Sequence, residues 1–155
     1  MEIGKAKETL LTYSGKDDIC NIFMKKGGNM STIRMNQIWN DYLDFMIIKT
    51  LASDVGSHTE MKYSASPLID ELWHCHVLCT LKYKQFMKLI NKVNPLVDFI
   101  HHSLELSFSS DDEKMKRRQA TINAYKYVFV FLFDSNNEDF NVGNLGEVNR
   151  RCDEN

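Results

Sequence analysis

Residues 66–83 read SPLIDELWHCHVLCTLKY, and this stretch decides the fold. Ser66 is a favoured helix N-cap, and Pro67 suits the first helical position because the N–H it lacks would have no helical partner there. Asp70 and Glu71 follow close to that start, where the helix dipole stabilises negative charge. The stretch therefore predicts a helix that begins at Pro67.

The predicted helix continues to about Lys92, because Asn94-Pro95 ends it. At about 100° per residue, His76 lies in the middle of its apolar stripe. The other members of the stripe fall within roughly 60° of His76: Ile69, Leu72, Trp73, Cys79, Thr80, Tyr83, Met87 and Ile90. We therefore expect Trp73 and Tyr83 to be core residues rather than ligand-binding residues.

The two histidines of this stretch face different ways. On a straight helix His74 points roughly 160° away from His76, so the pair is not expected to bind one ion despite the His-x-His spacing. Two other pairings suit the helical repeat: Asp70 with His74 at i,i+4, and His76 with Cys79 at i,i+3. We therefore predict an ion pair or hydrogen bond between Asp70 and His74 on the helix flank.

Two more helices are predicted on either side of this one. The first begins at an N-cap, Ser31 or Thr32, and residues 54–65 connect it to the central helix. Its apolar stripe has helical spacing: Met35, Ile38, Trp39, Tyr42, Phe45, Met46 and Lys49. The other follows the Ser-x-x-Glu capping box of residues 110–113. Its apolar run, residues 128–133, fits either a buried helix end or a strand.

The two ends of the chain carry weaker signals. Ile3, Ala6, Leu10 and Leu11 fit one short helix, and residues 19–24 fit either a strand or a docking segment. Residues 134–155 are polar, as in a loose tail. The sequence therefore predicts an all-α fold with three principal helices in a small bundle over residues 31–133, a shorter N-terminal element within residues 1–30 and a polar C-terminal tail.

Composition narrows the class of protein. The chain has 155 residues, of which 43% are hydrophobic, enough for the core of one domain. Its net charge of −2 gives no reason to expect nucleic-acid binding. There is no apolar signal segment, the longest apolar run is too short to span a bilayer, and the four cysteines lack disulfide-framework spacing. We expect a cytoplasmic protein without a membrane partner, and the oligomeric state is left open.

The central stretch resembles the glycine-rich domain-containing protein-like family. The resemblance rests on these residues: Ser66-Pro67, Asp70, Trp73-His74, His76, Tyr83 and His101-His102. It covers roughly residues 35–130 and implies a small all-α domain, sometimes joined to other modules, with no firmly assigned reaction. The chain departs from the pattern in four ways: it has no glycine-rich tail, Cys79 stands where relatives commonly carry Asp, no Pro follows the His-His pair closely, and Phe129 is followed by Val130 where relatives often have Phe-Gly and a Trp.

One hypothesis for the site is a metal centre. His76 and Cys79 have a workable ligand spacing, His101 or His102 would add a third ligand from the segment after Pro95, and such a Cys/His set suits zinc. Asp70 or Glu71 would orient a ring nitrogen of a ligand histidine. The competing hypothesis makes the histidine a neutral core residue and the cysteine a small hydrophobe.

Two further hypotheses concern activity. The many aromatic residues fit either core packing or an exposed patch that docks a protein partner. Catalysis would need Asp70 to orient His74 as a base, but no phosphate loop or nucleophile elbow accompanies them. The prediction is a non-enzymatic module whose His/Cys cluster organises the core and which serves protein interaction. The alternative is a metal-dependent enzyme.

The segment Phe99-Ile100-His101-His102 offers the sharpest geometric prediction. Successive residues of an extended segment point to opposite sides, so only one of the two histidines should face inward. We expect this inward histidine to approach the turn that holds His76 and Cys79, since the ring nitrogens of a buried histidine need partners.

Overall fold

All regular secondary structure is helical in the part of the chain that the computed structural model describes, which is residues 3–27, 29–55, 62–102 and 110–133. Side chains of the last helix are described as far as Tyr127. The helices are α1 (Ile3–Leu11), α2 (Lys16–Gly27), α3 (Thr32–Leu51), α4 (Pro67–Leu78), α5 (Thr80–Val93) and α6 (Asp111–Phe133). The predicted all-α class is confirmed, whereas the expected three principal helices have become six in the described residues.

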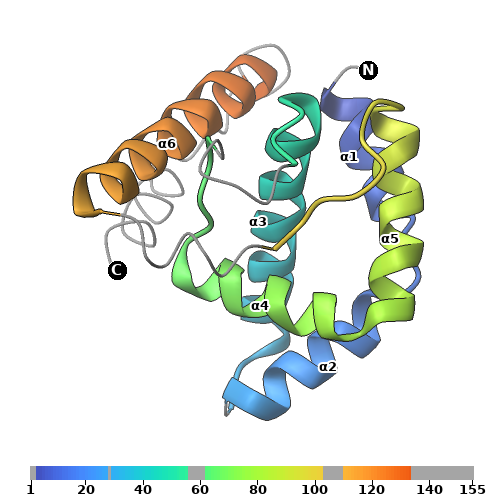
Figure 1. Cartoon of the computed structure of the whole chain (residues 1–155). Helices are drawn as coiled ribbons and strands as arrows, with labels where there is room; N and C mark the ends of the chain where they lie inside the picture. Colours follow the sequence, from blue (N-terminus) through green and yellow to red (C-terminus); the bar gives the residue numbers. More distant parts are fainter. Residues whose placement is uncertain (1–2, 28, 56–61, 103–109, 134–155) are drawn as a thin grey trace.

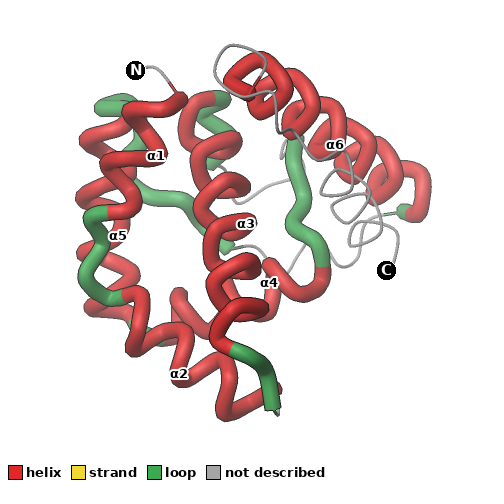
Figure 2. Tube along the Cα trace, turned by 180° about the vertical axis from the view of Figure 1, so that it is seen from behind, coloured by secondary structure: helices red, strands yellow, loops and turns green. Residues whose placement is uncertain are grey.

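The helices are arranged around α3. Helices α1, α3 and α5 lie side by side, and α4 runs across one end of this layer together with α2 (Figure 1). Helix α6 packs against α1 and α3 on another side, and the view from behind gives the same order (Figure 2). After α5 the chain returns across the front of the bundle, through residues 94–102, towards α4.

The N-terminal region contains two helices, α1 and α2, where the sequence predicted one short helix. Residues 19–24, expected as a strand or docking segment, lie inside α2. Both α1 and α2 contribute to the same hydrophobic core as the later helices: Ala6, Leu10, Ile19, Cys20 and Phe23 are buried in it. Asp17 and Asp18 in the first turn of α2 and Lys25 and Lys26 in its last turn suit the helix dipole.

The expected helix from residue 67 to about residue 92 has the predicted ends but is broken at Cys79. Cys79 has a φ of −84° and a ψ of 67°, which is not helical, and it ends α4 and begins α5. Its N–H still donates to the carbonyls of Cys75 and His76, and its own carbonyl accepts from Tyr83 N–H at 2.9 Å. Figure 1 shows the chain turning sharply there. His76 and Cys79 therefore do not share the face of one straight helix.

Helix α3 confirms its predicted stripe and extends it. Ser31 accepts a hydrogen bond from Arg34 N–H at 3.1 Å, as an N-cap should. All seven predicted stripe residues are buried, including Lys49. The C-terminal half is also buried on its other sides, at Leu43, Ile47, Ile48 and Thr50, because α1, α4, α5 and α6 all pack against this helix.

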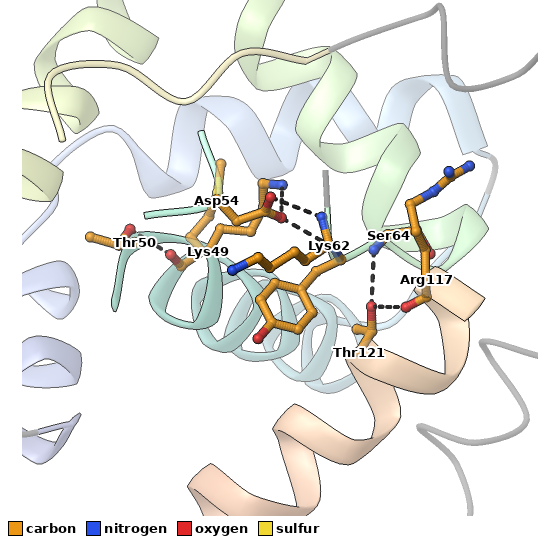
Figure 3. Close-up of polar contacts among 9 residues, drawn as sticks. Lys49, Thr50, Asp54, Lys62, Ser64, Arg117 and Thr121 are labelled. Atoms are coloured by element: carbon orange, nitrogen blue, oxygen red, sulfur yellow. Dashed lines mark hydrogen bonds and ion pairs between the residues drawn. The ribbon is translucent and has the colours of Figure 1, made fainter. Parts of the chain in front are cut away.

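A buried ion pair fixes the connection between α3 and α4. Lys49 Nζ lies 2.8 Å from Asp54 Oδ2, and both side chains are almost fully buried. The Asp54 carboxylate also accepts the backbone N–H groups of residues 62 and 63 at 2.9 and 3.1 Å. Ser64 N–H then donates to Thr121 Oγ1 at 2.9 Å, which attaches the same segment to α6 (Figure 3). Burial lowers the pKa of Lys49, and Asp54 opposes that shift.

Helix α6 begins as predicted. Ser110 and Glu113 exchange two hydrogen bonds of 3.3 Å, one from each backbone N–H to the other side chain, which is a capping box. Residues 128–133 continue the helix, so the strand alternative is wrong. The polar tail predicted for residues 134–155 lies outside the described residues.

Candidate functional site

His76 is the centre of a buried aromatic network. Its side chain is 0% exposed, and each ring nitrogen has a tyrosine hydroxyl as partner: Tyr13 Oη lies 2.9 Å from Nε2, and Tyr42 Oη lies 2.8 Å from Nδ1. Tyr13 donates its own proton to the carbonyl of Lys82 at 2.9 Å. It therefore accepts from Nε2–H, and Tyr42 donates to Nδ1. Burial lowers the pKa of His76 to about 3, so the ring is neutral near pH 7.

The Tyr13 arm of this network depends on Gly15. A Cβ at Gly15 would overlap the hydroxyl end of the Tyr13 ring. Tyr13 also stacks on Trp39, with ring centroids 6.0 Å apart and planes 9° apart. Only glycine leaves room for the tyrosine to run from the end of α1 into the core beside α4 and reach His76.

A second chain of hydrogen bonds holds the segment that follows α5. Trp73 Nε1–H donates to Tyr83 Oη at 3.1 Å, and Tyr83 O–H donates to the carbonyl of Ile100 at 2.5 Å. Ile100 is itself fully buried. Trp73 and Tyr83 are both core residues, as the apolar stripe predicted. This chain of bonds fixes the position of His101 and His102.

His102 is the inward histidine of the pair. Its side chain is 8% exposed, and its ring packs edge-on against Trp73 with centroids 4.6 Å apart. His101 is exposed and contacts the Phe99 ring, so the predicted alternation is confirmed. The predicted partner was wrong: His102 Nε2 lies 2.9 Å from Asp70 Oδ1, and the nitrogens of His76 are already occupied by tyrosines.

The same contact corrects the predicted Asp70–His74 pair. Asp70 bonds to His102, which comes from a separate segment, and His74 contacts the His102 ring with centroids 5.6 Å apart. An i,i+4 spacing permits an ion pair on a helix but does not exclude a better partner from elsewhere in the fold. Asp70, His74 and His102 therefore gather at one place, on the open side of α4.

This cluster lines a hollow between α2 and α4, which we call the α2–α4 hollow. Its volume is about 450 Å³, and its lining residues are Phe23, Lys26, Gly27, Asp70, Glu71, His74, Cys75 and His102. The α2 wall was missed at the sequence level, because residues 1–30 carry no motif that ties them to α4. Burial raises the pKa of the Cys75 thiol, which keeps it protonated. A second hollow of about 740 Å³ lies between α2 and residues 29–31 of the connection to α3, and among the described residues that line it only Lys25 is charged.

The predicted metal ligands are not brought together. His76 is bonded to two tyrosines, Cys79 is the residue at the helix break, His101 is exposed and His102 faces Asp70. Within the described residues, no three His, Cys, Asp or Glu side chains are already arranged to hold a metal ion. Nor does any described helix have the length and apolar character needed to cross a membrane.

Comparisons with protein-family models, curated proteins and solved structures find no match for this chain. The resemblance to the glycine-rich domain-containing protein-like family therefore stays a prediction from the motif residues. The geometry of the site shows two groups on opposite sides of α4. One is the buried, neutral network around His76, and the other is the open cluster of Asp70, His74 and His102.

Proposed function

We propose that this chain is a non-enzymatic helical module that docks a segment of a protein partner in the α2–α4 hollow. The observation that carries the proposal is the contrast between this hollow and the core. His76 has a pKa of about 3 and two buried hydrogen-bond partners, so it serves to organise the core and not to transfer protons near neutral pH.

The hollow suits a side chain of a docked segment. Its volume of about 450 Å³ is at the lower end of sizes typical of small-molecule sites. Phe23 contributes an apolar surface, Lys26 on α2 contributes a positive charge, and Asp70 and Glu71 on α4 contribute carboxylates. A peptide segment with a polar side chain would find both an apolar contact and a charged partner there. The family resemblance agrees, because it implies a small domain joined to other modules.

Site-specific photo-crosslinking tests the proposal. Benzoylphenylalanine is placed at residue 27, where a Cβ meets nothing within 4 Å, and the full chain is irradiated in cell extract. The control carries the same group at Lys88, an exposed position of α5. We expect a discrete crosslinked species from residue 27 alone, and we expect Glu71→Arg in the same chain to abolish it.

Two results would contradict the docking proposal. The first is an identical pattern of crosslinks from residues 27 and 88, which would mean non-specific collisions. The second is a crosslink from residue 27 that survives Glu71→Arg, which would place the partner outside the α2–α4 hollow.

A further inference from the structure

The geometry points to a divalent transition-metal site in the α2–α4 hollow, with Glu71, His74 and His102 as ligands and Asp70 as the residue that orients His102. Zinc is the ion whose chemistry fits best, because two imidazoles and one carboxylate make a donor set that it accepts. This inference rests on the same hollow as the proposed function. It concerns the isolated chain, so it can fail or hold independently of any protein partner.

The first step is the spacing of the two imidazoles. The ring centroids of His74 and His102 lie 5.6 Å apart. Two imidazoles on one tetrahedral zinc have centroids roughly 5 Å apart, since each ligating nitrogen is about 2 Å from the ion. The two rings are therefore close enough for one ion, and because His74 is exposed its ring can turn to bring a nitrogen towards that ion.

The second step is the bonding of the ring nitrogens. His102 uses Nε2 for Asp70, at 2.9 Å, and within the described residues its Nδ1 has no hydrogen-bond partner. His74 likewise makes no hydrogen bond within the described residues. A histidine that gives one nitrogen to a carboxylate and keeps the other for an ion is the usual arrangement at protein metal sites, because the carboxylate fixes the ring and raises its basicity.

The third step is the carboxylate ligand. Glu71 and His74 are three residues apart on α4, and both line the hollow. A Glu-x-x-His pair on one helix face is a spacing that metal sites in helical bundles use. Because Glu71 and His74 are both exposed, the three donors can converge by changes of rotamer while the backbone stays in place.

The fourth step is the rigidity of the His102 side of the site. The ring rests edge-on against Trp73, and the segment that carries it is held by the hydrogen bond from Tyr83 to Ile100. One ligand is thus fixed while two adjust. With three protein ligands, a zinc ion keeps one coordination position for water or for a group of the docked segment.

The experiment is zinc titration of the full chain, purified without a histidine tag and treated with a chelator. We expect one zinc ion per chain by calorimetry, and cobalt(II) should give a visible spectrum typical of nitrogen and oxygen ligands. His74→Ala and His102→Ala should each weaken binding by about ten-fold or more, and Asp70→Asn should weaken it by roughly 10- to 100-fold through loss of the oriented ring. Circular dichroism confirms that each variant is folded.

His101→Ala is the matched control, since His101 neighbours His102 but is exposed and faces away. Its zinc affinity should equal that of the parent. The site would be overturned by the absence of saturable zinc binding, or by affinity that is unchanged in both His74→Ala and His102→Ala. A thiolate charge-transfer band with cobalt(II) would overturn it too, by assigning the ion to cysteine.

Discussion

Helix α4 carries two histidines two residues apart, and they have different surroundings. His76 is fully buried, with a tyrosine on each ring nitrogen. His74 is exposed beside a hollow, and its nearest aromatic neighbour is another histidine. The same side chain is therefore a neutral cross-link on one face of the helix and a group available to a ligand on the other.

The comparison shows that the His-x-His spacing places its two histidines in two different environments. Residues two positions apart on a helix point roughly 160° away from each other, so one histidine meets the core and the other meets solvent. Burial then decides the chemistry, because desolvation disfavours the charged imidazole. Trp73 lies between the two environments: it donates to Tyr83 on the core side and contacts the His102 ring on the open side.

The largest effect should come from removing Trp73, which serves both sides of α4. Trp73→Ala loses the packing against Phe45, the hydrogen bond to Tyr83 and the surface on which His102 rests. We expect a loss of about 3–5 kcal/mol in the free energy of unfolding, measured in urea. Leu78→Ala, on the same helix but exposed, is the control and should change little. A Trp73→Ala protein as stable as the parent would show that the ring does not join the two sides.

The next largest effect tests the hydrogen bond between His76 and Tyr42 on the buried side of α4. His76→Phe keeps an aromatic ring at this position but leaves the Tyr42 hydroxyl without its partner in a fully buried position. We expect a loss of about 1–3 kcal/mol. Adding Tyr42→Phe should return part of that stability, because both polar groups are then gone, and a double-mutant cycle measures the coupling. Strict additivity of the two changes would mean that the hydrogen bond contributes nothing.

Much of this architecture can be predicted from the sequence because it depends on short-range signals. The cap at Ser31, the capping box of Ser110 and Glu113 and the stop at Asn94 are short-range signals, and the structure has all three. The burial of His76 and the inward turn of one residue of the His101-His102 pair follow from helical and extended periodicity, although periodicity does not say which of the two turns inward. Each of these patterns depends only on residues that are close together in the sequence.

The rest is decided by contacts between distant segments. The break at Cys79 carries no Gly or Pro signal; it lies where α4, across the end of the bundle, must give way to α5 along its side. Asp70 finds its partner 32 residues away in His102, in competition with a local His74 at ideal spacing. The α2 wall of the hollow comes from Phe23 and Lys26, whose approach to α4 no local pattern indicates.

The pH dependence of stability should report His76 specifically. Its pKa is about 3 in the folded protein and about 6.5 in the unfolded chain, so between these values the unfolded chain binds the additional proton. The free energy of unfolding should therefore fall as the pH drops from about 6.5, by about 1.4 kcal/mol per pH unit, and be flat above about 7 as far as this group is concerned.

His76→Gln supplies the baseline for that measurement, because other groups contribute to the total slope. Burial raises the pKa of Asp44, for example, which acts in the opposite direction since the folded state then holds the proton more tightly. The free energy of unfolding of the parent and of the variant is measured in urea at pH 7, 6 and 5, and the difference between the two proteins is compared across these pH values. Equal slopes in the two proteins would mean that His76 is solvated and protonates normally.

The smallest change in the free energy of unfolding is expected for His74, on the open side of α4. It tests most directly whether His74 and His76 differ in their structural role. His74→Ala removes an exposed side chain that makes no hydrogen bond within the described residues, so the free energy of unfolding in the absence of metal should change by less than about 0.5 kcal/mol. Its pH slope should match that of the parent, because His76 is intact. Adding saturating zinc should then stabilise the parent more than the variant, since only an ion bound to the folded state raises the unfolding free energy. A large loss of stability without zinc would show that His74 has a structural role like that of His76.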